Sequence, residues 1–154
     1  MPNRFVQRGG WWVLVQLLLL LAIAILGAAC RAASKQFPVF LVGWFLLATS
    51  AIGGIAGVLA LGRNLTPFPK PSATTGLVRH GIYARIRHPL YTSVCCAAVG
   101  WSLVWQSWAA LAVSLVLAIF FDAKARYEER WLRLQFPDYD AYAQQVRRFI
   151  PWVY

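Results

Sequence analysis

Apolar residues occur along the chain in long runs that polar stretches separate. The first two runs are Trp11–Ala29, in which Gln16 is the only polar side chain, and Phe40–Leu61. A helix needs about 20 apolar residues to cross a hydrocarbon layer about 30 Å thick. Each run therefore predicts a membrane-spanning helix.

Two shorter apolar runs follow, Leu90–Val104 and Trp108–Phe121. Each would cover only about 21–23 Å as a helix, which falls short of a full crossing. The second can continue as helix through Asp122–Leu134, so the pair predicts a hairpin whose charged end projects from the membrane. A short terminal helix is predicted over Tyr139–Arg148, after the break that Pro137 imposes.

The second run and the polar stretch after it carry two further signals. Gly53 and Gly57 have the GxxxG spacing, which lets another helix approach closely. The stretch Gly62–Gly81 is polar and contains three prolines. A loop this long is often a lid or a binding loop, and a plain connector is the alternative. Its proline-rich part, Thr66–Pro71, is a candidate gate.

The composition supports a membrane protein. About 60% of the 154 residues are apolar and 13% are charged, whereas soluble domains have roughly 45–50% and 25%. A core of this size cannot hide so much apolar surface, so lipid must solvate part of it. The three cysteines lie in or beside apolar runs without metal-ligand spacing.

The net charge of +10 is distributed as in a multi-pass membrane protein. With a cytosolic N-terminus and four crossings, all but two of the 15 basic residues lie inside, and Arg31 and Lys35 lie outside. This distribution favours anionic membrane lipids over nucleic acid as partners. It predicts a protein of the inner (plasma) membrane whose chemistry faces the cytoplasm.

The predicted fold is therefore an all-α integral membrane protein with about four membrane helices, the last two a short hairpin, and cytosolic C-terminal helices. It forms a single membrane domain over residues 1–154. Residues 1–61 hold two membrane helices, residues 62–89 form a cytosolic loop, and residues 90–154 form the hairpin and the C-terminal helices.

The scarce polar residues gather at the cytosolic mouth of the hairpin. Pro89 suits the first position of a helix and disfavours helical backbone at His88, so His88 is predicted to cap the helix. The free backbone amides there, with Arg87, favour an anion such as a carboxylate. Tyr91 lies on the first turn.

A second cluster contains Glu128 and Glu129 at the end of the partner helix. Antiparallel pairing brings this end beside the first cluster, and successive residues differ in direction by about 100°. One carboxylate can face solvent while the other faces the anion site. With the aromatic rings, these groups suit an amino acid that carries a sulfonium. In the alternative, the basic residues are snorkelling anchors and Glu128 pairs with Lys124.

The second half of the chain combines a Gly-x-Tyr motif, an Arg-His-Pro-x-Tyr motif and a later Glu-Glu pair. These residues are Gly81-Ile82-Tyr83, Arg87-His88-Pro89-Leu90-Tyr91 and Glu128-Glu129, followed by Phe136, Tyr139, Tyr142 and Ile150-Pro151. In this combination the chain resembles the isoprenylcysteine carboxyl methyltransferase family and its relatives, the phospholipid N-methyltransferases, as a bacterial-type member. The resemblance covers about Leu65 to Trp152.

The resemblance implies an S-adenosylmethionine-dependent methyltransferase with the cofactor at the cytosolic ends of the last two membrane helices. It implies that His88 and Tyr91 contact the methionine part of the cofactor and that Glu129 holds its amino group or ribose. Tyr83 and Arg87 complete the cofactor site.

The resemblance also implies an arginine near the Glu-Glu pair that holds the methyl acceptor. Arg126 is the nearest candidate and Lys124 is the alternative, while Glu128 completes the catalytic site.

A lipidic acceptor is expected to enter laterally between helices. A carboxylate acceptor needs no base, whereas an amine acceptor would need one, such as Glu128 or a tyrosinate. The absence of a dedicated base favours a carboxylate, with a phospholipid amine as the alternative. An NADPH-dependent membrane reductase and a non-catalytic membrane subunit are also compatible with the sequence, and the oligomeric state is open.

Overall fold

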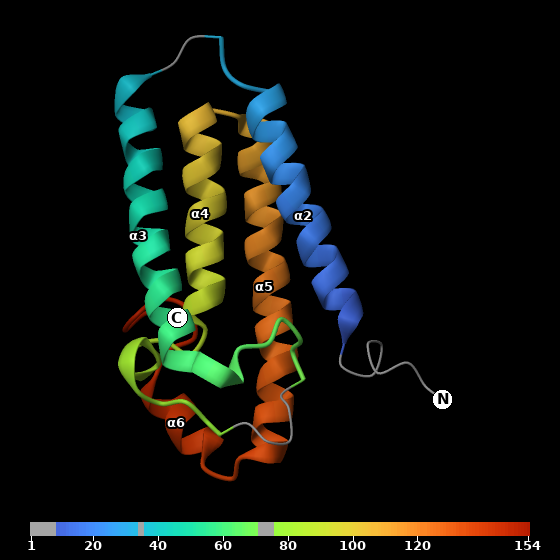
Figure 1. The fold of residues 1–154 in the computed structure, drawn as a ribbon, viewed down its shortest axis with the longest axis vertical. Helices are drawn as coiled ribbons and strands as arrows, with labels where there is room; N and C mark the ends of the chain where they lie inside the picture. The colour runs from blue at the N-terminus through green and yellow to red at the C-terminus, as the bar shows by residue number, and fades with distance from the viewer. Residues whose placement is uncertain (1–8, 34–35, 71–75) are drawn as a thin grey trace.

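The computed structural model describes residues 9–33, 36–70 and 76–154. Four long helices lie side by side in it (Figure 1). They are α2 (Gly10–Ala29), α3 (Phe37–Leu61), α4 (Pro89–Trp105) and α5 (Trp108–Gln135), with the short elements η1 (Gly62–Asn64), η2 (Gly81–Ala84) and α6 (Tyr139–Gln145). The described residues contain no strand beyond one isolated parallel bridge, which confirms the all-α prediction.

The long helices have the length and composition of membrane spans. Helices α2, α3 and α5 are long and apolar enough to cross a bilayer, while α4 has 17 residues. Large apolar side chains such as Leu18, Phe45 and Ile119 point outward and are exposed. In water this surface would be unfavourable, so lipid is its solvent.

Helix α3 packs closely on α4 through glycines. A Cβ atom at Gly57 would lie 2.8 Å from Leu90 Cδ2, and one at Gly53 would lie 2.9 Å from Ser93 Oγ. Real Cβ atoms do not approach so closely, so larger residues at these positions would displace the side chains of Leu90 and Ser93 on α4. The prediction that this GxxxG pair packs a helix is confirmed, and the partner is α4 of the same chain.

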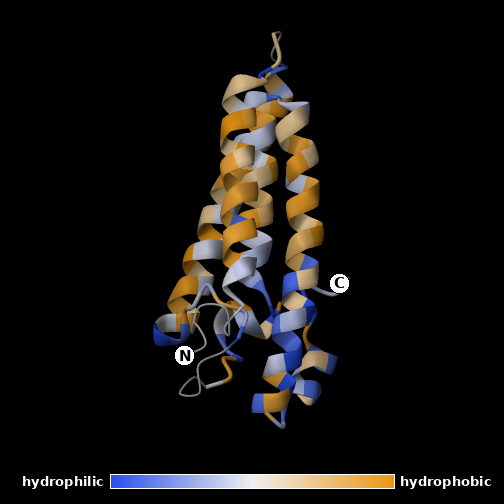
Figure 2. Ribbon diagram, turned by 90° about the vertical axis from the view of Figure 1, so that its right-hand side faces the viewer, coloured by the Kyte–Doolittle hydropathy of each residue, from blue (hydrophilic) through white to orange (hydrophobic). Residues whose placement is uncertain are grey.

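Polar residues gather at one end of the bundle, as Figure 2 shows by colour. This polar end consists of residues 62–70, 76–89 and 122–154. Helix α5 continues without a break from its apolar part into this end, as predicted, because no proline interrupts it before Pro137.

The terminal helix is shorter than predicted. It ends at Gln145, and the chain continues in extended conformation at Val146. The backbone N–H of Arg87 donates to the carbonyl of Arg147 (2.8 Å), and that of His88 donates to the carbonyl of Arg148 (3.0 Å). These long-range bonds satisfy the carbonyls of residues 147 and 148 without a helix, and they fix the C-terminal segment against the start of α4.

Candidate active site at the polar end

The start of α4 positions two of the predicted residues. His88 is the N-cap of the helix and Pro89 occupies its first turn, as the sequence predicts. The His88 ring stacks parallel to the ring of Tyr91, with centroids 5.2 Å apart. Tyr91 in turn stacks on the buried Phe121 of α5 at 4.6 Å. The two rings are therefore held in fixed orientation by the hairpin core.

Glu129 lies at the centre of a buried ionic cluster. Its Oε1 atom lies 3.1 Å from Arg87 Nε and 3.2 Å from His88 Nε2. Arg148 donates to both of its oxygens at 3.0 Å. The side chain of Glu129 is fully buried, so an unpaired charge there would be very unfavourable. The cluster joins α5, the start of α4 and the C-terminal segment.

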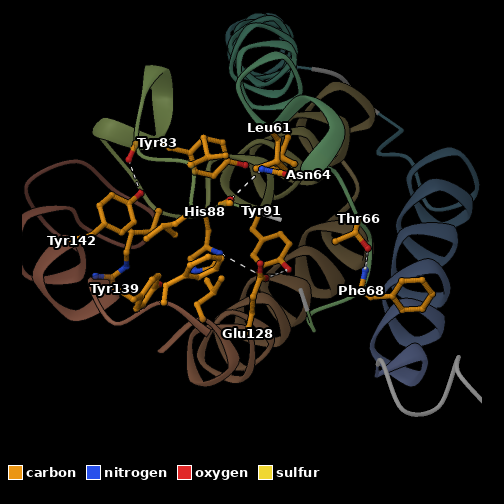
Figure 3. A pocket seen from close by; sticks show the side chains of 17 residues that line it. Leu61, Asn64, Thr66, Phe68, Tyr83, His88, Tyr91, Glu128, Tyr139 and Tyr142 are labelled. Atoms are coloured by element: carbon orange, nitrogen blue, oxygen red, sulfur yellow. Dashed lines mark hydrogen bonds and ion pairs between the residues drawn. The ribbon is translucent and has the colours of Figure 1, made fainter. Parts of the chain in front are cut away.

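Glu128 differs from its neighbour because it faces a pocket. Its Oε2 atom accepts a short hydrogen bond of 2.6 Å from the Tyr91 hydroxyl and lies 4.0 Å from His88 Nδ1. Figure 3 shows Glu128, His88 and Tyr91 pointing toward one another at the pocket wall. The carboxylates of Glu128 and Glu129 therefore both face inward. The 100° difference in direction between neighbouring helix residues had suggested that one of them faces solvent, and neither does so fully.

The rest of the pocket wall combines aromatic and aliphatic side chains. Tyr83 of η2 and Tyr142 of α6 are joined, because the Tyr142 hydroxyl donates to the Tyr83 carbonyl at 2.6 Å (Figure 3). Phe68 comes from the loop after η1. The pocket thus offers one carboxylate, one guanidinium, an imidazole and several π faces, a combination that suits an organic ligand with both positive and negative groups.

The hydroxyl of Tyr139 has no hydrogen-bond partner among the described residues, although the side chain is only 1% exposed. Tyr139 also lines the pocket. Buried hydroxyls are nearly always bonded, so a partner for this hydroxyl is missing from the described structure.

Burial keeps the site's tyrosines outside the membrane helices protonated. It raises the pKa of Tyr142 to about 12. Burial, together with the charge of Glu128, raises the pKa of Tyr83, and burial with the charge of Glu129 raises that of Tyr139. These hydroxyls therefore stay protonated near neutral pH and keep their capacity to donate a hydrogen bond.

Residues 66–68, which follow η1, lie at the site. Lys124 is buried and donates to the Pro67 carbonyl (3.2 Å) and to Gln16 of α2 (2.6 Å). Thr66 and Phe68 of the same loop line the pocket. Of the predicted gate Thr66–Pro71, Pro71 lies outside the described residues.

Comparisons with known proteins identify the family. A sequence model of the family described as "Phospholipid methyltransferase" matches residues 38–138, about two thirds of the chain. The chain belongs to the phospholipid methyltransferase family.

The individual relatives carry two kinds of name: some are named methyltransferases and others metal-resistance proteins. A "Probable protein-S-isoprenylcysteine O-methyltransferase" of Oryza sativa subsp. indica is 37% identical over 79 residues, which are 50% of this chain and 41% of that protein. "Protein-S-isoprenylcysteine O-methyltransferase A" of Arabidopsis thaliana is 32% identical over 102 residues, 64% of this chain and 52% of that protein. "Cobalt-zinc-cadmium resistance protein CzcN" of Cupriavidus metallidurans is 36% identical over 76 residues, 49% of this chain and 35% of that protein.

The chain spans about half the length, or less, of these relatives. The family match includes the α4–α5 hairpin and the pocket residues that the hairpin carries. The prediction of a family related to the isoprenylcysteine and phospholipid methyltransferases is confirmed.

The structure brings most of the predicted site residues together. Tyr83, Arg87, His88, Tyr91 and Glu128 line the pocket. Glu129 lies directly behind them, where it contacts Arg87 and His88.

Arg126, the first candidate for the residue that holds the methyl acceptor, does not lie at this pocket. Its side chain is 59% exposed and pairs with Asp122 at 2.7 Å on the outer face of α5. Lys124, two residues earlier, is buried, and its ammonium lies 5.2 Å from the ring centroid of Tyr91.

Sequence reasoning missed Arg148. Its guanidinium binds the buried Glu129 and also reaches Asp122 at 3.1 Å. In the sequence, Arg148 is the second residue of an Arg-Arg pair near the end of the chain. No local pattern distinguishes it from the other basic residues. No signal in the sequence could have identified this role, because the burial of Glu129 and the approach of the C-terminal segment are properties of the fold.

A second cavity, which forms an apolar groove, lies within the apolar part of the bundle. It is lined by α2, α3 and α4, with side chains that include Leu20, Leu47 and Trp101. Leu90 at the start of α4 lines both this groove and the polar-end pocket. The apolar groove and the pocket therefore share a wall one residue away from Tyr91.

Proposed function

We propose that this protein is a methyltransferase that uses S-adenosylmethionine to methylate a lipid-like acceptor, with its polar end facing the cytosol at the inner (plasma) membrane. The observation that carries the proposal is the pocket at the α4–α5 hairpin, which is lined by Glu128, Arg87, His88 and several aromatic rings, Tyr139 among them. Family membership and the methyltransferase names of the rice and Arabidopsis relatives support it.

The chemistry of the pocket fits this cofactor. S-adenosylmethionine supplies an electrophilic methyl group on a sulfonium, and its methionine part carries an ammonium and a carboxylate. Glu128 can pair with the positive charge, and aromatic side chains of the pocket wall such as Tyr83 and Phe136 can attract it. The Tyr139 hydroxyl can donate to a cofactor oxygen, which would satisfy a donor that lacks a partner in the described structure.

The geometry divides the proposed residues into two roles. Tyr83, His88, Tyr91 and Glu128 line the pocket and are proposed to contact the cofactor. Glu129 is proposed to act through Arg87 and His88, because its oxygens are occupied by these residues and by Arg148. It would orient the wall of the pocket and would not itself hold the ligand.

The acceptor is proposed to be a membrane lipid or a lipidic small molecule. Its apolar chain would occupy the groove between α2, α3 and α4, and its reactive group would pass Leu90 to reach Tyr91 and Glu128. Burial of apolar chain contributes about 0.8 kcal/mol per methylene when the reference is water, but much less when it is lipid. The groove would therefore align the acceptor more than it would attract it.

A carboxylate is the proposed reactive group. A carboxylate oxygen is already nucleophilic, so the protein must only align it and exclude water. The raised pKa values of Tyr83, Tyr139 and Tyr142 disfavour a tyrosinate base at these three positions. One observation favours the alternative of a phospholipid amine: Glu128 faces the pocket and is a carboxylate able to accept a proton.

Methyl transfer to defined lipids tests the proposal. The purified protein in nanodiscs receives radiolabelled S-adenosylmethionine together with either an isoprenylated cysteine or phosphatidylethanolamine. We expect label on the isoprenylated cysteine that mild alkali releases as methanol, because esters hydrolyse and N-methyl groups do not. Alkali-stable label on phosphatidylethanolamine would establish the amine reaction. No lipid-bound label with either acceptor would contradict both proposed acceptor classes.

A further inference from the structure

The last residues of the chain form a tight turn that exposes apolar side chains at the polar end. Ile150, Trp152 and Val153 are 52%, 80% and 72% exposed. The backbone N–H groups of Phe149 and Ile150 donate to the carbonyl of Tyr154 at 2.7 Å. The turn is therefore a folded feature, and its apolar tips are held outward.

Trp152 adopts a left-handed backbone conformation, with φ of 62°. A side chain as large as tryptophan rarely takes this conformation, which costs about 1–2 kcal/mol. In water the turn would combine this strain with an exposed indole and two exposed aliphatic side chains. Such a cluster indicates that another phase or molecule covers it.

The position of the turn identifies the membrane interface as that phase. The Tyr154 hydroxyl donates to Asp122 at 3.0 Å, and Asp122 is the first charged residue of α5 after its apolar part. Figure 2 shows the C-terminus beside the level where the colouring changes from apolar to polar. Tryptophan concentrates at this level in membrane proteins, because its ring is apolar and its N–H is polar.

The charges around the turn fit lipid headgroups. Arg126 is exposed and donates to the Tyr154 hydroxyl at 2.9 Å. Arg147 is exposed on the adjoining segment. Aromatic side chains with arginines beside them favour the headgroup region of a leaflet that contains anionic lipids.

We propose that the turn Ile150–Tyr154 inserts into the headgroup region of the leaflet at the polar end and anchors the C-terminal segment there. The anchored segment includes Arg148, which binds Glu129 behind the pocket. Its Phe149 carbonyl also accepts a hydrogen bond from Thr92 on α4 at 3.1 Å. Membrane contact at the turn thus supports the wall of the site.

Spin-label accessibility in nanodiscs with anionic lipid tests the insertion. A variant without native cysteines (Cys30→Ser, Cys95→Ala, Cys96→Ala) carries one nitroxide label through Val153→Cys, which leaves Trp152 in place. The matched references are Ile119→Cys on the lipid-facing surface of α5 and Gln144→Cys on the exposed side of α6. Oxygen partitions into lipid and a nickel chelate stays in water.

We expect the oxygen-to-nickel accessibility ratio at position 153 to be several-fold above the ratio at position 144. It should be closer to the ratio at position 119 than to the ratio at position 144. A ratio equal to that at position 144 would overturn the proposal. Shielding from both reagents would also overturn it, because another protein surface would then cover the turn.

Adding Trp152→Asp to the labelled protein provides the second measurement. We expect the ratio at position 153 to fall several-fold toward the value at position 144, and an unchanged ratio would contradict an anchoring role for Trp152. Neither measurement depends on methyl transfer, so the insertion can fail while the proposed function stands, and the reverse also holds.

Discussion

The two ends of α4 are held in place by different forces. In its apolar part, α4 meets α3 through small residues, and a Cβ at Gly43 would lie 2.7 Å from the backbone nitrogen of Val104. At the polar end, α4 and α5 meet through the charges of Arg87, Glu129 and Arg148. The apolar part is fixed by close approach of backbones, which tolerates few side-chain changes, and the polar end is fixed by pairing between distant residues.

This difference separates what fixes the fold from what binds a ligand. Glu128 and Glu129 are neighbours in sequence, but one lines the pocket and the other lies in the buried ionic cluster. Substitutions at the two positions should therefore have different effects, and substitutions in the apolar part should leave ligand affinity alone.

Glu129→Gln should give the largest effect. The amide cannot neutralise Arg87 and Arg148, and breaking a buried pair costs about 3–5 kcal/mol. We expect a large loss of stability against SDS-driven unfolding in bicelles, accompanied by loss of cofactor binding. Glu128→Gln is the matched control, and equal losses of stability in the two variants would contradict the division between them.

Gly43→Ala should destabilise the apolar part by about 1–3 kcal/mol. The added methyl would meet the α4 backbone at Gly100 and Val104. In Gly54→Ala, on the same helix, the nearest atom lies at an ordinary 3.7 Å, so its stability should be close to wild type. Calorimetry on the folded protein should give wild-type cofactor affinity for both, and a weakened affinity in Gly43→Ala would show that the two ends are not independent.

Tyr139→Phe should have a smaller and more selective effect. Its hydroxyl has no partner in the described residues, so the folded protein loses no bond and its stability should not fall. The loss of one hydrogen bond to the ligand corresponds to about 0.5–1.5 kcal/mol, or roughly 2–12-fold weaker binding of S-adenosylmethionine. Unchanged affinity would show that the hydroxyl does not meet the cofactor.

Arg126→Gln should have the smallest effect on cofactor binding and only a small effect on stability. Its ion pair with Asp122 is exposed, and such pairs contribute about 0–1 kcal/mol. We expect cofactor affinity within twofold of wild type, whereas Lys124→Met should alter the loop at Pro67 and the pocket that this loop lines. Strong loss of cofactor affinity in Arg126→Gln alone would reverse the ranking of the two cations.

The sequence allowed most of the helices to be predicted, because long apolar runs have few alternatives to membrane helices. The cap at His88 was also predictable, since Pro89 imposes it locally. The end of α6 was not, because Val146 and the two residues after it extend to pair with the start of α4. Such pairing depends on tertiary contacts that no local pattern encodes.

The sequence identified most residues of the candidate site, but it did not show how they are arranged. Lys124 and Arg126 are two positions apart, about 200° around a helix, so only the rotation of α5 in the bundle decides which one is buried. Arg148 binds Glu129 from 19 residues away. The sequence does not show which cations a buried carboxylate selects, because the closure of the C-terminal segment determines it.

The most direct test of the account is calorimetric titration of S-adenosylmethionine into the nanodisc-embedded wild type and Glu128→Gln, with unfolding midpoints measured in parallel. The account predicts micromolar binding at one site per chain, lost or weakened more than tenfold in Glu128→Gln while its midpoint stays close to wild type. Absence of binding by a folded wild type, or equal affinity in both proteins, would contradict the assignment of this pocket to the cofactor.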